Sequence, residues 1–173
     1  MIRPQIPLFL LLLLFACGQR RTYVDIGQEG RFSLRAPDYL YAAGDPGADS
    51  LLSYHNPRRN VYLMVRHTHW DELLDANPEM ELSDYYDFHA ENLLQGLELP
   101  EAPGPEAVEI HDLKGLRGHF QGKYKGDDIY AHLMLLESND YLYQILFWSR
   151  LEGKKHYQAD ADTLMNSFRE LSN

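Results

Sequence analysis

Four strands are predicted in succession over the second half of the chain, joined by short turns rich in Gly, Asp and Asn. In the last two strands apolar side chains occupy both the odd and the even positions. A strand that is apolar on both faces is covered on both faces, so these two are expected at the centre of a sheet. The strands are 107–113, 116–124, 129–137 and 141–150, with turns at 114–115, 125–128 and 138–140.

Two segments have apolar residues at the three- and four-residue spacing of a helix that buries one face. The first covers 83–97, with Ser83 or Asp84 as its capping residue, and a Pro-rich loop at 99–105 follows it. The second closes the chain, and a single helical turn is expected at 71–77 before a proline. The apolar stripes are Leu82, Tyr86, His89 or Ala90, Leu93 and Leu97 in the first helix, and Tyr157, Ala161, Leu164, Phe168 and Leu171 in the second.

Ahead of the first long helix, two further pairs of strands are predicted. Residues 23–26 and 32–35 flank a glycine turn, and residues 51–55 and 61–67 flank a turn-forming cluster. Residues 42–49 are rich in Gly, Ala, Asp and Pro, which is typical of a loop. Two helices and a mainly antiparallel sheet buried on both faces predict the α+β class, as a three-layer α/β/α sandwich.

An apolar run near the N-terminus ends at the only cysteine, Cys17. The run covers nine residues, 8–16, whereas a transmembrane helix needs about 20. Its length is that of the hydrophobic region of a signal peptide, and Arg3 supplies the positive charge ahead of it. The sequence Leu14-Phe15-Ala16-Cys17 resembles the lipobox of bacterial lipoproteins. The resemblance implies cleavage between Ala16 and Cys17 and a lipid on the new N-terminal cysteine.

This interpretation divides the chain into a signal peptide, 1–16, a lipidated cysteine with a short tether, 17–22, and one globular domain, 23–173. The alternatives are ordinary signal cleavage, which leaves one unpaired thiol in an oxidising compartment, and a buried N-terminal helix. Gly18 follows the cysteine, and glycine there resembles the outer-membrane address of lipoproteins. The expected location is therefore the bacterial cell envelope, lipid-anchored at the outer membrane and facing the periplasm.

The net charge of the chain limits the classes of partner that it can bind. The chain has 16 Lys and Arg against 26 Asp and Glu, a formal net charge of −10. An acidic domain without a basic stripe repels nucleic-acid phosphates, so no nucleic acid is expected as a partner. Arg20 and Arg21 lie next to Cys17, where anionic head groups attract each basic side chain by about 1 kcal/mol. An ordinary polar linker is the alternative for this pair.

His67 and His69 are the candidates for a metal site. The sequence His67-Thr68-His69-Trp70-Asp71 superficially resembles the H-x-H-x-D opening of metallo-β-lactamase sites. In a strand the two imidazoles share a face and can reach one divalent ion. Glu72 stands where that family has a histidine, and the family's surrounding α/β repeats are absent. Polar residues at a strand end are the favoured interpretation, so no metal or cofactor is expected.

Aromatic residues in loops and at helix edges are candidates for lining a ligand cleft. For each of them core packing is the alternative, and for the histidine among them the alternative is a buried, hydrogen-bonded position. No nucleophile elbow, P-loop or calcium loop is present in the sequence, so no catalytic residue is assigned. The candidate ligand-binding residues are Tyr39, Tyr54, Trp70, Tyr85 and His132.

The order of several segments resembles the PsbP/Mog1-like superfamily over residues 23–171. Its members have an α/β/α sandwich used for binding and assembly, and they share no common active site. The resemblance therefore implies a non-enzymatic module that binds an envelope protein; the alternative is a carrier of a small ligand or metal, or an enzyme, using the aromatic cleft. The segments are Phe32 to Ala36-Pro37, the Asn56-Pro57 turn, Gly118, Gly122, Tyr124 and Tyr130 across a hairpin, Tyr141-Leu142-Tyr143-Gln144-Ile145, and Met165-Asn166-Ser167-Phe168.

Overall fold

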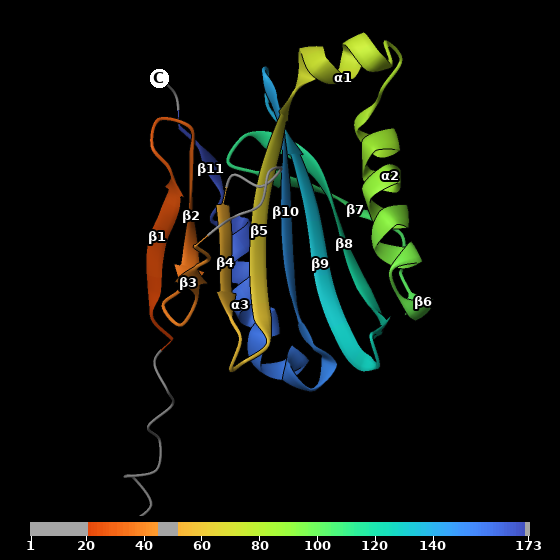
Figure 1. Cartoon of the computed structure of the whole chain (residues 1–173). Helices are drawn as coiled ribbons and strands as arrows, with labels where there is room; N and C mark the ends of the chain where they lie inside the picture. Colours follow the sequence, from red (N-terminus) through yellow and green to blue (C-terminus); the bar gives the residue numbers. More distant parts are fainter. Residues whose placement is uncertain (1–20, 45–51, 172–173) are drawn as a thin grey trace, which may run out of the picture.

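The computed structural model describes residues 21–44 and 52–171, which form two sheets and the helices that cover them (Figure 1). The larger sheet has the strand order β3-β4-β5-β10-β9-β8-β6, and β7 pairs with β8 beside this path. Every pair in it is antiparallel. Its strands are β3 (Tyr41–Ala42), β4 (Leu52–Asn56), β5 (Val61–His69), β6 (Glu98–Glu101), β7 (Glu106–Ile110), β8 (Leu113–Tyr124), β9 (Asp127–Glu137) and β10 (Tyr141–Arg150).

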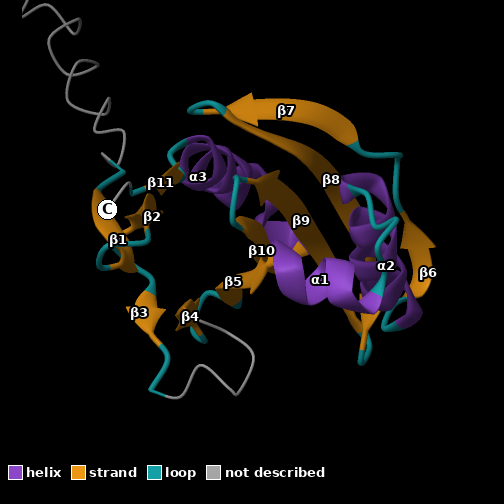
Figure 2. Cartoon of the chain, turned by 90° about the horizontal axis from the view of Figure 1, so that it is seen from above, coloured by secondary structure: helices purple, strands orange, loops and turns teal. Residues whose placement is uncertain are grey.

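Helices cover both faces of this sheet (Figure 2). On one side lie α1 (Trp70–Ala76) and α2 (Leu82–Gln95). On the other lie α3 (Lys154–Asn166), entered through the 3-10 helix η3 (Leu151–Gly153), and a small antiparallel sheet in the order β1-β2-β11. The predicted α+β sandwich with a mainly antiparallel sheet is thus confirmed, and the small sheet shares the outer layer of α3. Its strands are β1 (Tyr23–Gln28), β2 (Phe32–Pro37) and β11 (Arg169–Glu170).

The strands β9 and β10 are central, as their two apolar faces predict. Their opposite faces belong to two different cores, because successive side chains of a strand point to opposite sides of the sheet. Each fully buried large apolar side chain contributes about 1.5–3 kcal/mol relative to an exposed one. The core beside α3 includes Phe32, Leu63, Met134, Phe147 and Leu164, and the core beside α2 includes Tyr86, Phe120, Leu133, Leu135 and Leu146.

The turn predicted at 114–115 is wrong. The chain turns at His111 and Asp112, whose φ angles are both positive, 48° and 71°. Gly115 lies inside β8, where a Cβ atom would meet the carbonyl oxygen of Leu135 on the neighbouring strand. This glycine therefore serves a close approach of two backbones and not a turn.

The expected loop at 99–105 is wrong in its first part, which belongs to the edge strand β6. Residues Glu98 and Glu101 pair with β8 across an irregular register. Proline is tolerated on an edge strand because its missing N–H faces away from the ladder. Periodicity gives no sign of so short a strand, because all four of its residues are exposed.

Two helix ends also differ from prediction. The N-cap of α2 is Glu81 and not Ser83 or Asp84, and the Asp84 carboxylate accepts a hydrogen bond from the Glu81 backbone N–H at 3.0 Å. The last helix ends at Asn166, after which the chain extends into β11 and pairs with β2. Phe168 remains fully buried in the core although it lies beyond the helix.

No helix among the described residues is both long and apolar enough to cross a membrane. The predicted signal peptide, Ala16, Cys17, Arg20 and most of the predicted 42–49 loop lie outside the described residues. The division of the chain at residues 16 and 22 stays a prediction.

Candidate functional site

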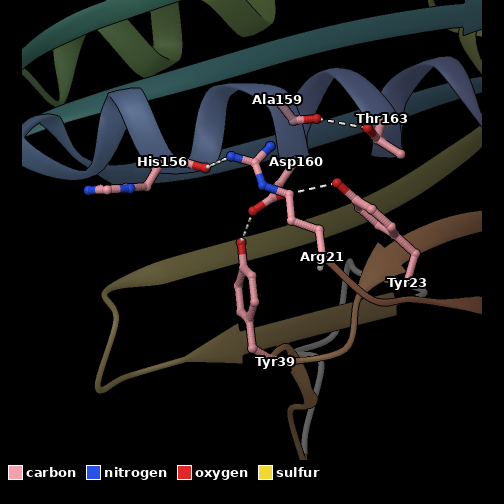
Figure 3. Close-up of polar contacts among 7 residues, drawn as sticks. All are labelled: Arg21, Tyr23, Tyr39, His156, Ala159, Asp160 and Thr163. Carbon is pink, nitrogen blue, oxygen red and sulfur yellow. Dashed lines mark hydrogen bonds and ion pairs between the residues drawn. The ribbon is translucent and has the colours of Figure 1, made fainter. Parts of the chain in front are cut away.

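A buried carboxylate, Asp160 of α3, joins three separate parts of the domain (Figure 3). Its side chain is almost inaccessible, with the residue 3% exposed. The hydroxyl of Tyr23, at the start of β1, donates to Oδ1 at 2.8 Å, and the hydroxyl of Tyr39, after β2, donates to Oδ2 at 2.9 Å. The Arg21 Nε atom lies 3.5 Å from Oδ1. We call these four residues the Asp160 clamp.

The position of Asp160 on its helix explains why it is buried. It lies between Tyr157 and Ala161, both of which face the core beside α3. A carboxylate in such a place is costly unless its oxygens accept hydrogen bonds, and the two tyrosine hydroxyls and the guanidinium satisfy them. Burial, followed by the charge of Asp160, raises the pKa of the Tyr39 hydroxyl far above its usual value. Tyr39 is therefore a neutral hydrogen-bond donor at any physiological pH.

A cavity of about 610 Å³ opens beside the clamp. The Arg59 guanidinium lies 4.4 Å from the centre of the Tyr39 ring, and an Arg21 guanidinium N–H donates to the carbonyl oxygen of His156 at 3.0 Å. The wall is mainly polar and carries two guanidinium groups and two carboxylates, so it favours polar over apolar ligands. The lining residues are Arg21, Thr22, Pro37, Asp38, Tyr39, Arg59, His156, Tyr157 and Asp160.

Sequence reasoning missed the clamp, apart from naming Tyr39 as a candidate. The one available signal is Asp160 itself, a charged residue between two members of an apolar helical stripe. Such a residue indicates a buried polar contact, but the sequence does not name its partners, of which the two tyrosines lie 121 and 137 residues earlier in the chain.

A second, apolar groove of about 290 Å³ lies between the end of α2 and the sheet. Beside it the rings of Tyr62 and Trp148 stack at 3.9 Å between centroids. Neither aromatic residue was among the predicted site residues. The groove is lined by Asn92, Leu93, Gly96, Leu97, Tyr124, Ile129, Ala131, Leu146 and Trp148.

The four aromatic candidates do not line one cavity. Tyr39 lies in the polar cavity, and Tyr54 packs against the core beside α3. Trp70 begins α1, and its indole N–H donates to the Ser138 carbonyl oxygen at 3.2 Å. The Tyr85 hydroxyl, on α2, lies 3.2 Å from the Thr68 hydroxyl. Each of the last three therefore has a packing or hydrogen-bonding partner in the fold itself.

His132 is fully buried on β9, on the face of the sheet that α3 covers. Its ring lies 4.4 Å from that of His119 and 4.6 Å from that of Tyr130. Neither of its nitrogens has a hydrogen-bond partner among the described residues. Burial, reinforced by the positive charges of His119 and Arg117, lowers the pKa of His132 to about 3. It is a neutral core residue, without the hydrogen bonds expected of a buried histidine.

His67 and His69 lie two positions apart on β5, as predicted, but each is engaged separately. The Arg31 guanidinium contacts His67 Nε2, and His69 Nδ1 accepts the backbone N–H of Asp71 at 3.2 Å as the cap of α1. Burial and then the Arg31 charge lower the pKa of His67. A guanidinium against one imidazole repels a metal cation. Within the described ranges no group of three or more His, Cys, Asp or Glu side chains is placed to hold a metal ion.

The domain resembles several solved structures in fold. No family model matches the chain, and no curated protein matches its sequence. The cyanobacterial PsbP of Synechocystis sp. PCC 6803 superposes with a TM-score of 0.63 at 14% identity, covering 91% of this chain and 99% of that one. LpqN of Mycobacterium tuberculosis, described as involved in cell envelope biogenesis, superposes with a TM-score of 0.61 at 9% identity, covering 88% and 92%. At these identities the matches establish the fold, which is PsbP-like, as the order of the segments predicts.

Proposed function

We propose that this chain, whose domain has the PsbP-like fold, is a lipid-anchored envelope protein that acts as a non-enzymatic binding or assembly module for a partner protein. The Asp160 clamp carries this proposal. The carboxylate that borders the polar cavity is held by two tyrosine hydroxyls and a guanidinium. A carboxylate with its oxygens occupied in this way holds structure together and is not poised to take a proton from a substrate. The likeness in fold to an envelope protein, LpqN, supports the location.

The clamp also limits how far the domain lies from the proposed anchor. Arg21 is held against α3 through Asp160 and the His156 carbonyl oxygen. Only four peptide units separate Arg21 from Cys17, and these span about 14 Å when fully extended. A single acyl chain binds a membrane weakly, whereas two or more hold a protein there stably. A domain anchored through Cys17 therefore works close to the membrane surface.

The proposed partner surface is the outer face of α1 and α2. The helix α1 lies at the end of the molecule opposite the start of β1, and α2 runs from there along one side of the molecule (Figure 1). Residues 70–95 contain eight Asp or Glu and no Lys or Arg. Phe88 of α2 is 60% exposed in the middle of this acidic surface. An exposed aromatic ring among charged groups is typical of an interaction hot spot, and the charge favours a basic partner.

Photo-cross-linking in cells tests the partner. A photoreactive amino acid at Phe88 is expected to give one discrete adduct with an envelope protein, and the same amino acid at the exposed Gln158 of α3 is the matched control. In a chain that carries the photoreactive amino acid at a neighbouring position of α2, the substitution Phe88→Glu is expected to abolish the adduct. Identical adducts from positions 88 and 158, or none from position 88, would overturn the proposed surface.

Fractionation tests the anchor. The wild-type chain is expected in the membrane fraction, with the mass of a diacylglycerol group on the N-terminal peptide. Cys17→Ser is expected to remove the lipid mass from the N-terminal peptide. A Cys17→Ser variant that still carries the lipid mass, or a wild-type chain without it, would exclude lipidation at this residue.

A further inference from the structure

Basic side chains of this acidic protein gather at the end where the chain enters the domain. This tether end comprises the start of β1, the end of β2, the turn between β4 and β5, the link from α2 to β6, the turn between β8 and β9, and the link from β10 to α3 (Figure 1). It contains eight of the 16 Lys and Arg but only five of the 26 Asp and Glu. Its formal net charge is +3, whereas that of the whole chain is −10. The segments are 21–22, 37–38, 56–60, 96–98, 123–128 and 150–156.

The positive charge at the tether end remains largely uncompensated. Two carboxylates there are already paired, Asp127 with Arg150 at 3.0 Å and Asp128 with Lys123 at 2.8 Å. The other basic side chains at this end, Arg21 excepted, have no carboxylate within ion-pair distance in the described part of the chain. These are Arg58, Arg59, Lys125, Lys154 and Lys155, of which all but Lys154 are exposed.

Two further features of this end suit a membrane surface. Tyr124 is 42% exposed, with the ammonium group of Lys125 5.0 Å from its ring centre. Tyrosine is enriched at membrane–water interfaces, where its ring lies at the level of the lipid head groups. The helix α3 begins at this end, so the positive end of its dipole adds to the side-chain charge.

The opposite end of the molecule is strongly acidic. Residues 70–95, in α1 and α2, carry eight carboxylates without a Lys or Arg. The helix α1 lies at the far end of the central sheet, and α2 runs from that end along one side of the molecule (Figure 1). At moderate ionic strength a charged surface acts only on groups within about 8–10 Å, so it acts on whichever end of the domain approaches it. A bilayer rich in anionic lipids therefore attracts the tether end when that end approaches it, and repels the α1 end when that end approaches it.

We propose that the tether end is a docking surface for the head groups of anionic phospholipids, which orients the domain with α1 at the end that points away from the bilayer. The proposal extends the proposed function, on which it rests for what brings the domain to a membrane. The contact itself depends only on the exposed basic groups, so it is testable without the lipid on Cys17.

Vesicle co-sedimentation of the full chain carrying Cys17→Ser tests the surface. The probes are vesicles of phosphatidylglycerol with phosphatidylethanolamine, and neutral vesicles of phosphatidylcholine. The apolar run 8–16 is present in every sample, so the difference between the two vesicle types reports the charge. Binding to the anionic vesicles is expected to be at least about tenfold stronger, and to fall towards the neutral value at 1 M salt, where screening acts within about 3 Å.

Two variants with the same change in net charge locate the contact. The first variant, Arg58→Glu with Lys155→Glu, reverses the charge of two exposed side chains at the tether end. The second, Lys114→Glu with Arg169→Glu, reverses the charge of two exposed side chains at the opposite end. The first is expected to lose about tenfold or more of its anionic-vesicle binding, and the second less than about threefold. Far-UV circular dichroism and urea midpoints identify a variant that has lost its fold.

Equal losses in the two variants, or equal binding of Cys17→Ser to anionic and neutral vesicles, would overturn the docking surface. These outcomes are separate from the fate of the anchor. A chain that is lipidated in cells but shows no preference for anionic vesicles keeps the anchor and excludes the docking surface. A chain that is not lipidated but binds anionic vesicles through Arg58 and Lys155 excludes the anchor and keeps the docking surface.

Discussion

A single carboxylate connects the beginning and the end of this domain. Asp160 holds Tyr23 of β1 and Tyr39 after β2 through their hydroxyls, and Arg21 through its guanidinium. Taking a charged group out of water is unfavourable, so burial of the Asp160 carboxylate is stable only while all of its partners are present. The clamp therefore makes the first residues of the domain part of the fold and not a free extension.

Replacing Asp160 by Ala is expected to lower the free energy of unfolding by about 3 kcal/mol, because the Tyr23 and Tyr39 hydroxyls lose their acceptor and Arg21 loses its ion-pair partner. Urea denaturation measures the change. Gln158→Ala, at an exposed position of the same helix, is the control and is expected to stay within about 0.5 kcal/mol of wild type. Equal effects of the two substitutions would show that the clamp contributes no stability.

His132 gives the domain a predictable dependence on pH. Its pKa falls to about 3 in the folded state, mainly through burial. The unfolded imidazole has its ordinary pKa of about 6.5, so the unfolded chain binds a proton below that pH while the folded chain does not. The free energy of unfolding therefore decreases as the pH falls from about 6.5 towards 3, by up to about 1.4 kcal/mol per pH unit.

His132→Leu is expected to remove this part of the pH dependence. Urea midpoints of variant and wild type between about pH 4.5 and 7 measure it, and the wild-type curve is expected to be the steeper one by up to about 1.4 kcal/mol per pH unit. A residual slope is expected in the variant, because burial also lowers the pKa of His89, to about 4. Parallel curves for the two proteins would contradict the assignment to His132.

The helix α2 packs closely on the sheet because one residue of β8 is a glycine. Gly118 of β8 faces α2, and a Cβ atom at that position would fall on the hydroxyl of Tyr86. That hydroxyl is buried without a hydrogen-bond partner among the described residues, and burial raises its pKa to about 12. The tyrosine thus contributes ring packing here, and the glycine provides the space for its end.

Gly118→Ala is expected to lower the free energy of unfolding by about 2 kcal/mol, because the added methyl group forces α2 away from β8. Combining it with Tyr86→Phe, which removes the clashing oxygen, is expected to recover at least half of that loss. A double-mutant cycle from urea denaturation measures the coupling. Additive effects of the two substitutions would show that Gly118 and Tyr86 do not contact each other as described.

The whole domain is organised around strands that serve two cores at once. On β9, Leu133 belongs to the core beside α2 and Met134 to the core beside α3. Neither core can open without exposing the other face of the same strands. The two layers of helix are therefore expected to unfold in one cooperative step.

Leu133→Ala and Leu164→Ala test this cooperativity from opposite faces of the sheet. Each is expected to lower the free energy of unfolding by about 2–5 kcal/mol, because each leaves a cavity in a fully buried site. Far-UV circular dichroism and tryptophan fluorescence are expected to give coincident urea transitions in both variants. Separate transitions in either variant would show that the two cores unfold independently.

Local patterns in the sequence are sufficient for most of the elements and for the layers. Alternating apolar positions identify β9 and β10 as central strands, and helical spacing identifies α2 and α3, because periodicity reports which face of an element is buried. The same patterns misplace the turn at His111 and Asp112 and miss β6 and β11. Those features depend on pairing with distant strands, and short exposed strands have no apolar period of their own.

The candidate site and the distribution of charge depend on contacts that no local pattern records. Arg21, Tyr39 and Asp160 meet only after the order of the strands is established, and the sequence names Tyr39 alone among them as a candidate. The formal charge of −10 is a property of the composition, but its separation into a basic and an acidic end arises from the fold, because alternating antiparallel strands bring distant turns to one end of the sheet. The lipid anchor at Cys17 stays a prediction from sequence, whereas the surface that faces the membrane is defined by side chains that the tertiary structure brings together.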